Sequence, residues 1–210
     1  MKMAFLFLSA LSSVSVASAQ RYLFYLHGKI VEDQGAGAVD TINGFGAYLY
    51  EDILETFRKK NFTVVSEVRQ KNTDMETYAR KVKAEIDSLL QQGTAAANIT
   101  VVGASKGAAI AMLVSSLLKN ENVNFVFMAG CNENLLAMLP PINFCGNILS
   151  VYESTDDIGK SCTPVKNHSS QKVSHYKEIE LNTGLRHGFI FKPLPEWVEP
   201  VTAWAQGNYN

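Results

Sequence analysis

The sequence predicts a three-layer α/β fold, in which a mostly parallel sheet of about six strands is covered by helices on both faces. Three observations predict it. Short apolar, β-branched segments alternate along the chain with longer segments of helical spacing, as in strands connected by crossover helices. The strand-like segments are rich in apolar residues, as expected where both faces of a sheet are buried. A Gly-x-Ser-x-Gly motif, Gly103 to Gly107, joins one such strand to a helix.

The individual elements follow from the spacing of apolar residues and from the residues that end each segment. Strands are predicted over residues 21–26, 62–68, 98–102, 123–128, 147–152 and 177–181. Helices are predicted over residues 44–60, 74–92, 108–118, 134–139 and 195–206. Gly93 ends the second of these helices, and Pro140 ends the fourth.

Length and composition indicate one globular domain, residues 20–210, preceded by a signal peptide, residues 1–19. The 210 residues are 47% hydrophobic, which is enough for a substantial core. The net charge is −1 and no long run of like charge occurs, so nucleic acid is not expected as a partner. Nothing in the composition indicates an oligomeric state.

The first 19 residues have the features of a secretory signal. Lys2 precedes an apolar segment that ends in Ala17-Ser-Ala19, a small-x-small pattern that signal peptidase accepts. A retained membrane anchor is the alternative, although the apolar segment is short for a span and rich in serine. Cleavage before Gln20 predicts a secreted or periplasmic protein with no stable membrane insertion afterwards.

Export would place the three cysteines in an oxidising compartment, where a disulfide is expected. Cys131 and Cys162 both follow strand ends and could lie on the same face of the molecule. Cys145 enters its strand from the opposite end, so the expected disulfide is Cys131–Cys162. No CxxC or CxxH spacing indicates a metal site.

Ser105, at the centre of the Gly-x-Ser-x-Gly motif, is the predicted nucleophile. A turn this tight between a strand and a helix strains the serine backbone, and the flanking glycines relieve the crowding. Small residues would also let a helix pack tightly on a strand with no catalytic role, and that alternative stays open. A serine hydroxyl needs a histidine base and a carboxylate that orients the base.

His187 is the predicted base, because it follows the last predicted strand and precedes the final helix. His27 ends the first strand, a position better suited to an oxyanion loop. His168 and His175 lie in a polar stretch that is expected to be a solvated surface loop.

Asp156 is the predicted acid, because it lies four residues past the apolar strand that ends at Tyr152. Asp157 is its immediate rival and Glu153 a more distant one, since an aspartate in such a position also serves as a turn or helix cap. In parallel sheets, functional side chains gather beyond the carboxyl ends of the strands. The predicted nucleophile, acid and base all meet this condition.

Two backbone N–H groups are expected to form an oxyanion hole. One belongs to Lys106, at a helix N-terminus where the dipole favours negative charge. The second is assigned to Lys29, in the turn after the first strand. The Lys106 side chain either attracts anionic substrates or is solvated. The segment from Glu32 to Gly37 either lines the substrate pocket or forms a solvated flexible loop.

With these features the chain resembles a compact α/β-hydrolase. The matching features are His27-Gly28 after the first strand, the Gly-x-Ser-x-Gly motif, Asp156 after a later strand and His187-Gly188 before the last helix. They span residues 21–206, and the order serine, acid, histidine is that of the α/β-hydrolases. The resemblance implies hydrolysis of an ester, thioester or amide through an acyl-serine, with no cofactor.

Two departures from the α/β-hydrolase pattern shape the expected function. Lys29 and Ile30 follow His27-Gly28, so the lipase-type His-Gly-Gly-Gly is absent. Only residues 129–146 separate two strands where many members carry a lid, which predicts an open site for small or protruding substrates.

The expected function is therefore an exported serine hydrolase that acts on a small-molecule carboxylester or thioester. Amidase or acyltransferase chemistry would use the same residues. One alternative is a non-catalytic binding protein of the cell envelope with the same fold. Another is a lidless hydrolase of polymers or lipids, which requires an exposed apolar rim around Ser105.

Overall fold

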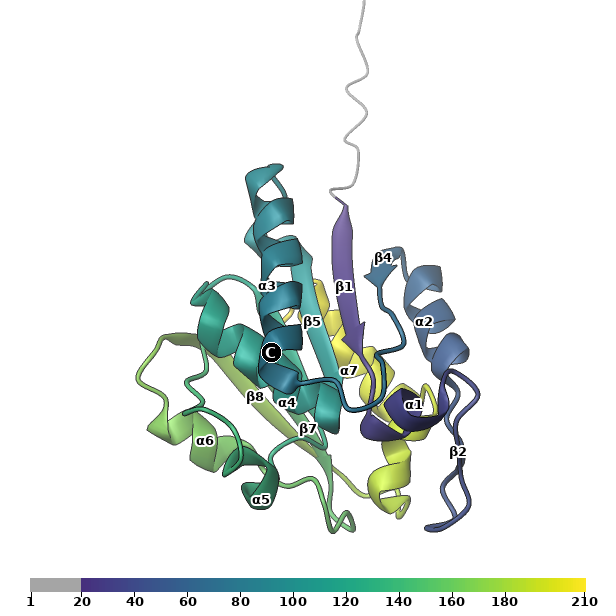
Figure 1. Ribbon diagram of the computed structural model, residues 1–210. Helices are drawn as coiled ribbons and strands as arrows, with labels where there is room; N and C mark the ends of the chain where they lie inside the picture. The colour runs from purple at the N-terminus through teal and green to yellow at the C-terminus, as the bar shows by residue number, and fades with distance from the viewer. Residues whose placement is uncertain (1–19) are drawn as a thin grey trace, which may run out of the picture.

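The computed structural model describes residues 20–210, which form an α/β structure of three layers (Figure 1). The expected signal peptide lies outside the described residues. All neighbouring strands of the central sheet are parallel, in the order β4-β1-β5-β6-β7-β8. The strands are β1 (Arg21–Leu26), β4 (Phe62–Val65), β5 (Ile99–Ala104), β6 (Asn124–Met128), β7 (Gly146–Glu153) and β8 (Val173–Leu181). The predicted fold class is confirmed.

Helices cover both faces of this sheet, and a short hairpin lies at its carboxyl edge. The helices are α1 (Lys29–Gln34), α2 (Tyr50–Lys59), α3 (Met75–Gln91), α4 (Lys106–Leu118), α5 (Glu133–Leu136), α6 (Thr163–His168) and α7 (Pro195–Ala205). Two short 3₁₀ helices, η1 (Ala96–Asn98) and η2 (Arg186–Phe191), and the hairpin strands β2 (Val39–Asp40) and β3 (Gly46–Ala47) complete the elements. No helix within residues 20–210 has the length and apolar character needed to cross a bilayer.

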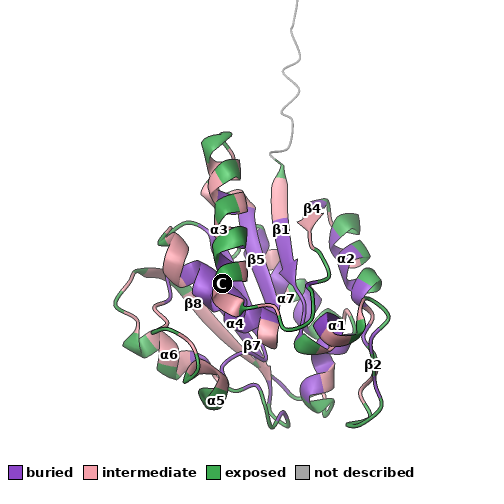
Figure 2. Ribbon diagram, in the orientation of Figure 1, coloured by how far each residue is buried: buried purple, intermediate pink, exposed green. Residues whose placement is uncertain are grey.

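Each strand contributes to two hydrophobic layers, because successive side chains point to opposite faces. Leu23 and Tyr25 of β1 pack in the layer that contains α2 and α7. Phe24 and Leu26 of the same strand pack against α3 and α4. The central strands are accordingly buried along most of their length, while exposed residues lie on the outer surfaces of the helices (Figure 2). Burial on both faces explains why these strands are apolar at nearly every position.

The segment between β1 and α2 differs most from its prediction. The start of the expected loop over Glu32–Gly37 lies in a helix, α1, and β2 pairs with β3 in an antiparallel hairpin. The predicted helix over residues 44–60 begins only at Tyr50. Gly44 and Gly46 have φ values of 76° and 77°, which an α-helix does not allow, so the apolar spacing before Tyr50 belongs to the hairpin.

The polar stretch that contains His168 and His175 is also more ordered than expected. His168 ends α6, where its Nδ1 lies 2.7 Å from the Pro164 carbonyl oxygen. His175 belongs to β8, which begins at Val173 rather than at residue 177. Its Nδ1 lies 2.8 Å from Oδ1 of Asn147, at the amino end of β7. Both side chains therefore take part in local structure rather than in a solvated loop.

Candidate active site

Ser105 occupies the turn between β5 and α4 at the carboxyl edge of the sheet. Its φ of 54° and ψ of −118° are strained for a residue with a side chain. A Cβ atom on Gly103 would lie 2.3 Å from the Gly107 carbonyl oxygen, and one on Gly107 would lie 1.8 Å from the Leu26 oxygen. Only glycine fits at either position, because α4, β5 and the end of β1 approach so closely. This packing presents the Ser105 hydroxyl at the sheet edge.

The structure brings Ser105, His187 and Asp156 together in one hydrogen-bonded chain. Ser105 Oγ lies 2.9 Å from His187 Nε2, and His187 Nδ1 lies 2.7 Å from Asp156 Oδ2. Burial raises the pKa of the Asp156 carboxyl, but its bonds with His187 and with backbone N–H groups outweigh this and hold the pKa below its ordinary value. An ionised carboxylate only accepts, so Nδ1 of His187 donates and Nε2 is left to accept from Ser105.

The two rival carboxylates occupy other positions. Asp157 is exposed and forms an ion pair with Arg186, at 2.8 Å. Glu153 is buried at the end of β7, where it accepts hydrogen bonds from the Thr183 amide at 2.9 Å and from the Thr183 hydroxyl at 2.7 Å. Burial raises the pKa of Glu153, but these hydrogen bonds lower it by more. The net pKa lies below its ordinary value, so the group stays ionised. Glu153 therefore fixes the turn that precedes His187, and only Asp156 contacts the histidine.

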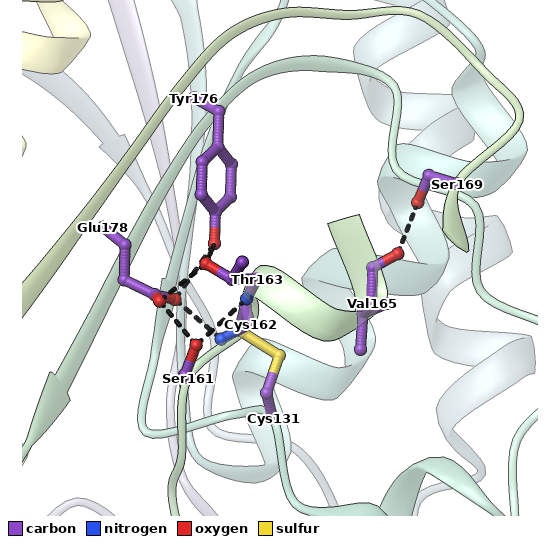
Figure 3. The surroundings of a disulfide bond; sticks show 8 residues. All are labelled: Cys131, Ser161, Cys162, Thr163, Val165, Ser169, Tyr176 and Glu178. Carbon is purple, nitrogen blue, oxygen red and sulfur yellow. Dashed lines mark hydrogen bonds between the residues drawn. A yellow bond between two sulfur atoms is a disulfide. The ribbon is translucent and has the colours of Figure 1, made fainter. Parts of the chain in front are cut away.

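A disulfide between Cys131 and Cys162 joins the loops that follow β6 and β7 (Figure 3). Glu178 of β8 binds the same region, since its carboxylate accepts from the Cys162 amide at 2.7 Å and from the hydroxyls of Ser161 and Thr163 (Figure 3). The expected disulfide is present. Together with Glu178 it anchors the loop that carries the predicted acid.

The predicted oxyanion donors are the first residues of two different helices. Lys29 begins α1 and Lys106 begins α4, and the amides of a first helical turn have no partner within the helix. Gly28 lies directly beside the nucleophile, because a Cβ atom there would be 3.5 Å from the Cβ of Ser105. The turn after β1 and the start of α4 thus flank Ser105.

The side chains behind these amides form a buried ion-pair cluster that the sequence reading did not find. Glu32 is buried and accepts hydrogen bonds from Lys106 Nζ at 2.6 Å and from Arg69 Nε at 3.2 Å. Glu32 itself is therefore neither solvated nor part of the pocket wall, whereas Asp33 and Gln34 of the same segment do line the pocket beside Ser105, as one of the two predictions had it. The Lys106 side chain is engaged with Glu32 rather than directed at a substrate. Arg69 lies in an irregular loop, and no motif in the sequence marks it.

His27 supports the same side of the site and does not contact Ser105. Its Nε2 accepts from the Arg69 amide at 2.9 Å, so Nδ1 carries the proton and donates to the Gly28 carbonyl at 2.8 Å. Burial, together with the nearby Arg69 guanidinium, lowers the pKa of His27 to about 4. The ring is neutral at neutral pH and holds the turn after β1 in one arrangement.

A pocket of about 350 Å³ opens beside Ser105 and His187, between α1, the β2–β3 hairpin and η2. Its apolar lining consists of Ile30, Val39, Ile42, Phe45, Tyr48, Ile158, Ile190 and Phe191. Ile42, in the turn of the hairpin, is 92% exposed, and Ile158 is 46% exposed. Apolar side chains therefore reach the solvent at the mouth of the pocket. Within residues 20–210, no group of His, Cys, Asp or Glu side chains is arranged to hold a metal ion.

One protein family matches part of the chain. The family model for lipase (class 3) matches residues 41–136, a segment that contains Ser105 and ends before Asp156 and His187. No curated protein sequence matches the chain.

Several solved structures share the fold. An α/β serine hydrolase without a lid from Xanthomonas campestris has a TM-score of 0.55 and 13% identity, over 92% of this chain and 84% of that one. SOBER1 of Arabidopsis thaliana has a TM-score of 0.54 and 15% identity, over 91% of this chain and 100% of its own. A protein of unknown function from Agrobacterium tumefaciens, described as an α/β hydrolase, has a TM-score of 0.58 and 16% identity, over 92% of this chain and 86% of its own. The chain therefore has the fold of the α/β hydrolases.

Proposed function

We propose that the protein is a serine hydrolase that cleaves a carboxylester or thioester with an apolar acyl group. One observation carries the proposal: Ser105 and His187, which form a hydrogen-bonded chain with Asp156, line a largely apolar pocket. The strained backbone of Ser105, and the amides of Lys29 and Lys106 at the starts of the two helices beside it, fit the same chemistry. The match to the class 3 lipase model supports hydrolase activity.

The geometry assigns a role to each group. His187 Nε2 takes the proton from Ser105 as Oγ bonds to the substrate carbonyl carbon, and the carbonyl π electrons move onto the oxygen. The amides of Lys29 and Lys106 donate to that oxyanion. The imidazolium gives its proton to the leaving alcohol or thiol, whose bond to the carbonyl carbon breaks. Water, deprotonated by His187, then releases the acyl group as an acid and restores Ser105.

The pocket favours an acyl group of limited size. Its volume of about 350 Å³ lies near the lower end of the range typical of small-molecule sites. Its walls include Ile30, Phe45 and Phe191, which offer apolar contacts rather than hydrogen bonds. Export is part of the proposal, and it is supported by the signal-like segment over residues 1–19 and by the Cys131–Cys162 disulfide.

The exposed apolar side chains at the mouth favour a second candidate, a hydrolase that acts on aggregated lipid or polymer esters. Ile42 is 92% exposed in the hairpin turn, and Val39 and Ile158 extend the apolar rim along the pocket. Exposed apolar groups around a binding site are typical of contact with an apolar surface. A rate that rises when the same ester passes from solution into an emulsion would distinguish this candidate from the first.

Hydrolysis of p-nitrophenyl esters of graded acyl length tests the proposed function. We expect turnover by the wild-type protein, with a preference for short or medium chains, and a loss of about 10⁴-fold or more in Ser105→Ala. Equal rates in the two proteins would contradict the assignment of Ser105. No turnover of any ester or thioester by the folded wild type would favour the non-catalytic binding role.

A further inference from the structure

The cluster of Glu32, Arg69 and Lys106 connects the two helices that begin at the predicted oxyanion donors. The side chains of Glu32 and Arg69 are fully buried, and that of Lys106 is 15% exposed. Glu32 lies one turn inside α1 and receives the Lys106 ammonium on Oε1, at 2.6 Å. The Glu32–Lys106 bond therefore spans directly from α1 to the start of α4.

Arg69 ties the turn that precedes α1 to the same carboxylate. Its amide donates to the ring of His27, its Nη2 donates to the His27 carbonyl, and its Nε reaches Glu32 at 3.2 Å. Lys106 Nζ also donates to the Thr73 carbonyl at 2.8 Å. Arg69 and Lys106 therefore contact Glu32 directly, and the turn after β1 joins the cluster through Arg69.

Burial of such a cluster is unfavourable in free energy. Removing a carboxylate, a guanidinium and an ammonium from water costs several kcal/mol for each ion, and apolar side chains of similar size are often as stable or more so. Burial raises the pKa of Glu32, but the hydrogen bonds from Lys106 and Arg69 reverse this and hold it below its ordinary value, so the ion pairs persist. The presence of such a cluster is therefore weak evidence for a purely stabilising role.

Oxyanion stabilisation does require a fixed spacing. The two donors, the amides of Lys29 and Lys106, belong to different helices, and both must point at one oxygen atom. We propose that Glu32 is a positioning residue that sets the distance between these two amides by binding the Lys106 side chain, while Arg69 holds the turn before Lys29. The inference rests on the proposed function.

The proposed role predicts a specific kinetic effect. The oxyanion exists only after Ser105 Oγ has bonded to the carbonyl carbon. Misplaced amides therefore stabilise the transition state less and leave substrate binding unchanged. Displacement of a donor by about 1 Å reduces the rate by up to about 100-fold. Breaking the Glu32–Lys106 bond should therefore lower kcat by about 10- to 100-fold and leave KM within about twofold.

The bond can be broken from either side. Glu32→Gln keeps the shape of the side chain and removes its charge, and Lys106→Met removes the ammonium but keeps the backbone amide. The double variant should lose no more activity than the more impaired single variant, because both substitutions remove the same connection. Glu121→Gln is the matched control, since Glu121 pairs with Lys172 on the surface near the amino end of β6. Chemical denaturation confirms that each variant is folded at the assay temperature.

The outcomes separate the two proposals. Lower kcat at constant KM in both single variants, with an unchanged Glu121→Gln, supports the positioning role. Wild-type activity in folded Glu32→Gln and Lys106→Met overturns it, and so does a change confined to KM. Absence of turnover and of phosphonate labelling in the wild type itself overturns the proposed function, and the positioning role with it.

Discussion

The loops after β1 and β4 and the loops after β6 and β7 hold opposite sides of the candidate site, and different interactions fix them. On the side of the proposed oxyanion donors, hereafter the oxyanion side, a buried cluster of charges joins Glu32 to Arg69 and Lys106. On the acid–base side, a disulfide from Cys131 to Cys162 joins the two loops. There, buried and half-buried carboxylates accept hydrogen bonds mainly from amide and hydroxyl groups.

Because the interactions differ, different changes should disrupt each side of the site. A charge cluster loses its balance when one member is removed, because the remaining ions stay buried without a partner. A disulfide is a covalent bond that persists when a nearby charge is removed, and it is broken by reductant instead. The two sides should therefore respond to different substitutions and different solution conditions.

The largest expected effect lies on the acid–base side. Asp156→Asn should lower kcat on a soluble ester by about 10⁴-fold, because an amide in place of the carboxylate favours the wrong tautomer of His187. Asp157→Asn is the matched control, since Asp157 is exposed and pairs with Arg186 rather than with His187. We expect its kcat to stay within about twofold of wild type. Similar losses in the two variants would contradict the assignment of Asp156.

On the oxyanion side, Arg69→Met should lower the free energy of unfolding by about 3–5 kcal/mol, because Glu32 then keeps only Lys106 as a partner. Urea denaturation measures the loss. Arg58→Met provides the comparison, since the Arg58–Glu55 pair is exposed and should contribute less than about 1 kcal/mol. If Arg69→Met were no more destabilising than Arg58→Met, the buried cluster would not hold this side together.

Removal of the disulfide should cost somewhat less. For a sequence separation of 31 residues, the chain-entropy model gives about 3–4 kcal/mol. Denaturation of Cys131→Ala/Cys162→Ala, with and without reductant, measures this loss. Cys145→Ala is the control, because Cys145 is buried and outside the disulfide, so that variant should stay sensitive to reductant. A double variant as stable as wild type would show that hydrogen bonds alone hold the acid–base loops.

The smallest expected effect concerns pH. The pKa of His27 is about 4 in the folded protein and near 6.5 when unfolded, so the unfolded chain takes up the proton first. Its contribution to stability is complete above about pH 6.5 and is lost as the pH falls towards 4, by about 3 kcal/mol. His27→Gln should flatten the stability profile in this window. A profile in His27→Gln as steep as that of the wild type would show that His27 does not supply this pH dependence.

Much of the acid–base chain could be predicted from the sequence, because strand ends and one motif mark it. Gly103 and Gly107 identify the turn at Ser105, and the apolar strands place Asp156 and His187 at the same sheet edge. The choice between Asp156 and its neighbour Asp157 depends on the geometry of one turn, and that geometry has no signature in residue type.

The oxyanion side could not be predicted in the same way. Glu32 and Arg69 are 37 residues apart, and their pairing exists only once α1 packs against the loop after β4. The β2–β3 hairpin was not predicted either, because strands of two residues are too short to show an alternation of apolar and polar residues. Both features depend on tertiary packing, which local spacing does not encode.

Covalent labelling with a fluorophosphonate tests the central claim most directly, because only an activated serine reacts with it. Peptide mapping of the labelled protein should find one adduct, on Ser105, and none in Ser105→Ala. His187→Ala should label far more slowly, since it lacks the base that lies 2.9 Å from the hydroxyl. An adduct on another serine, or no adduct on the folded protein, would contradict the account.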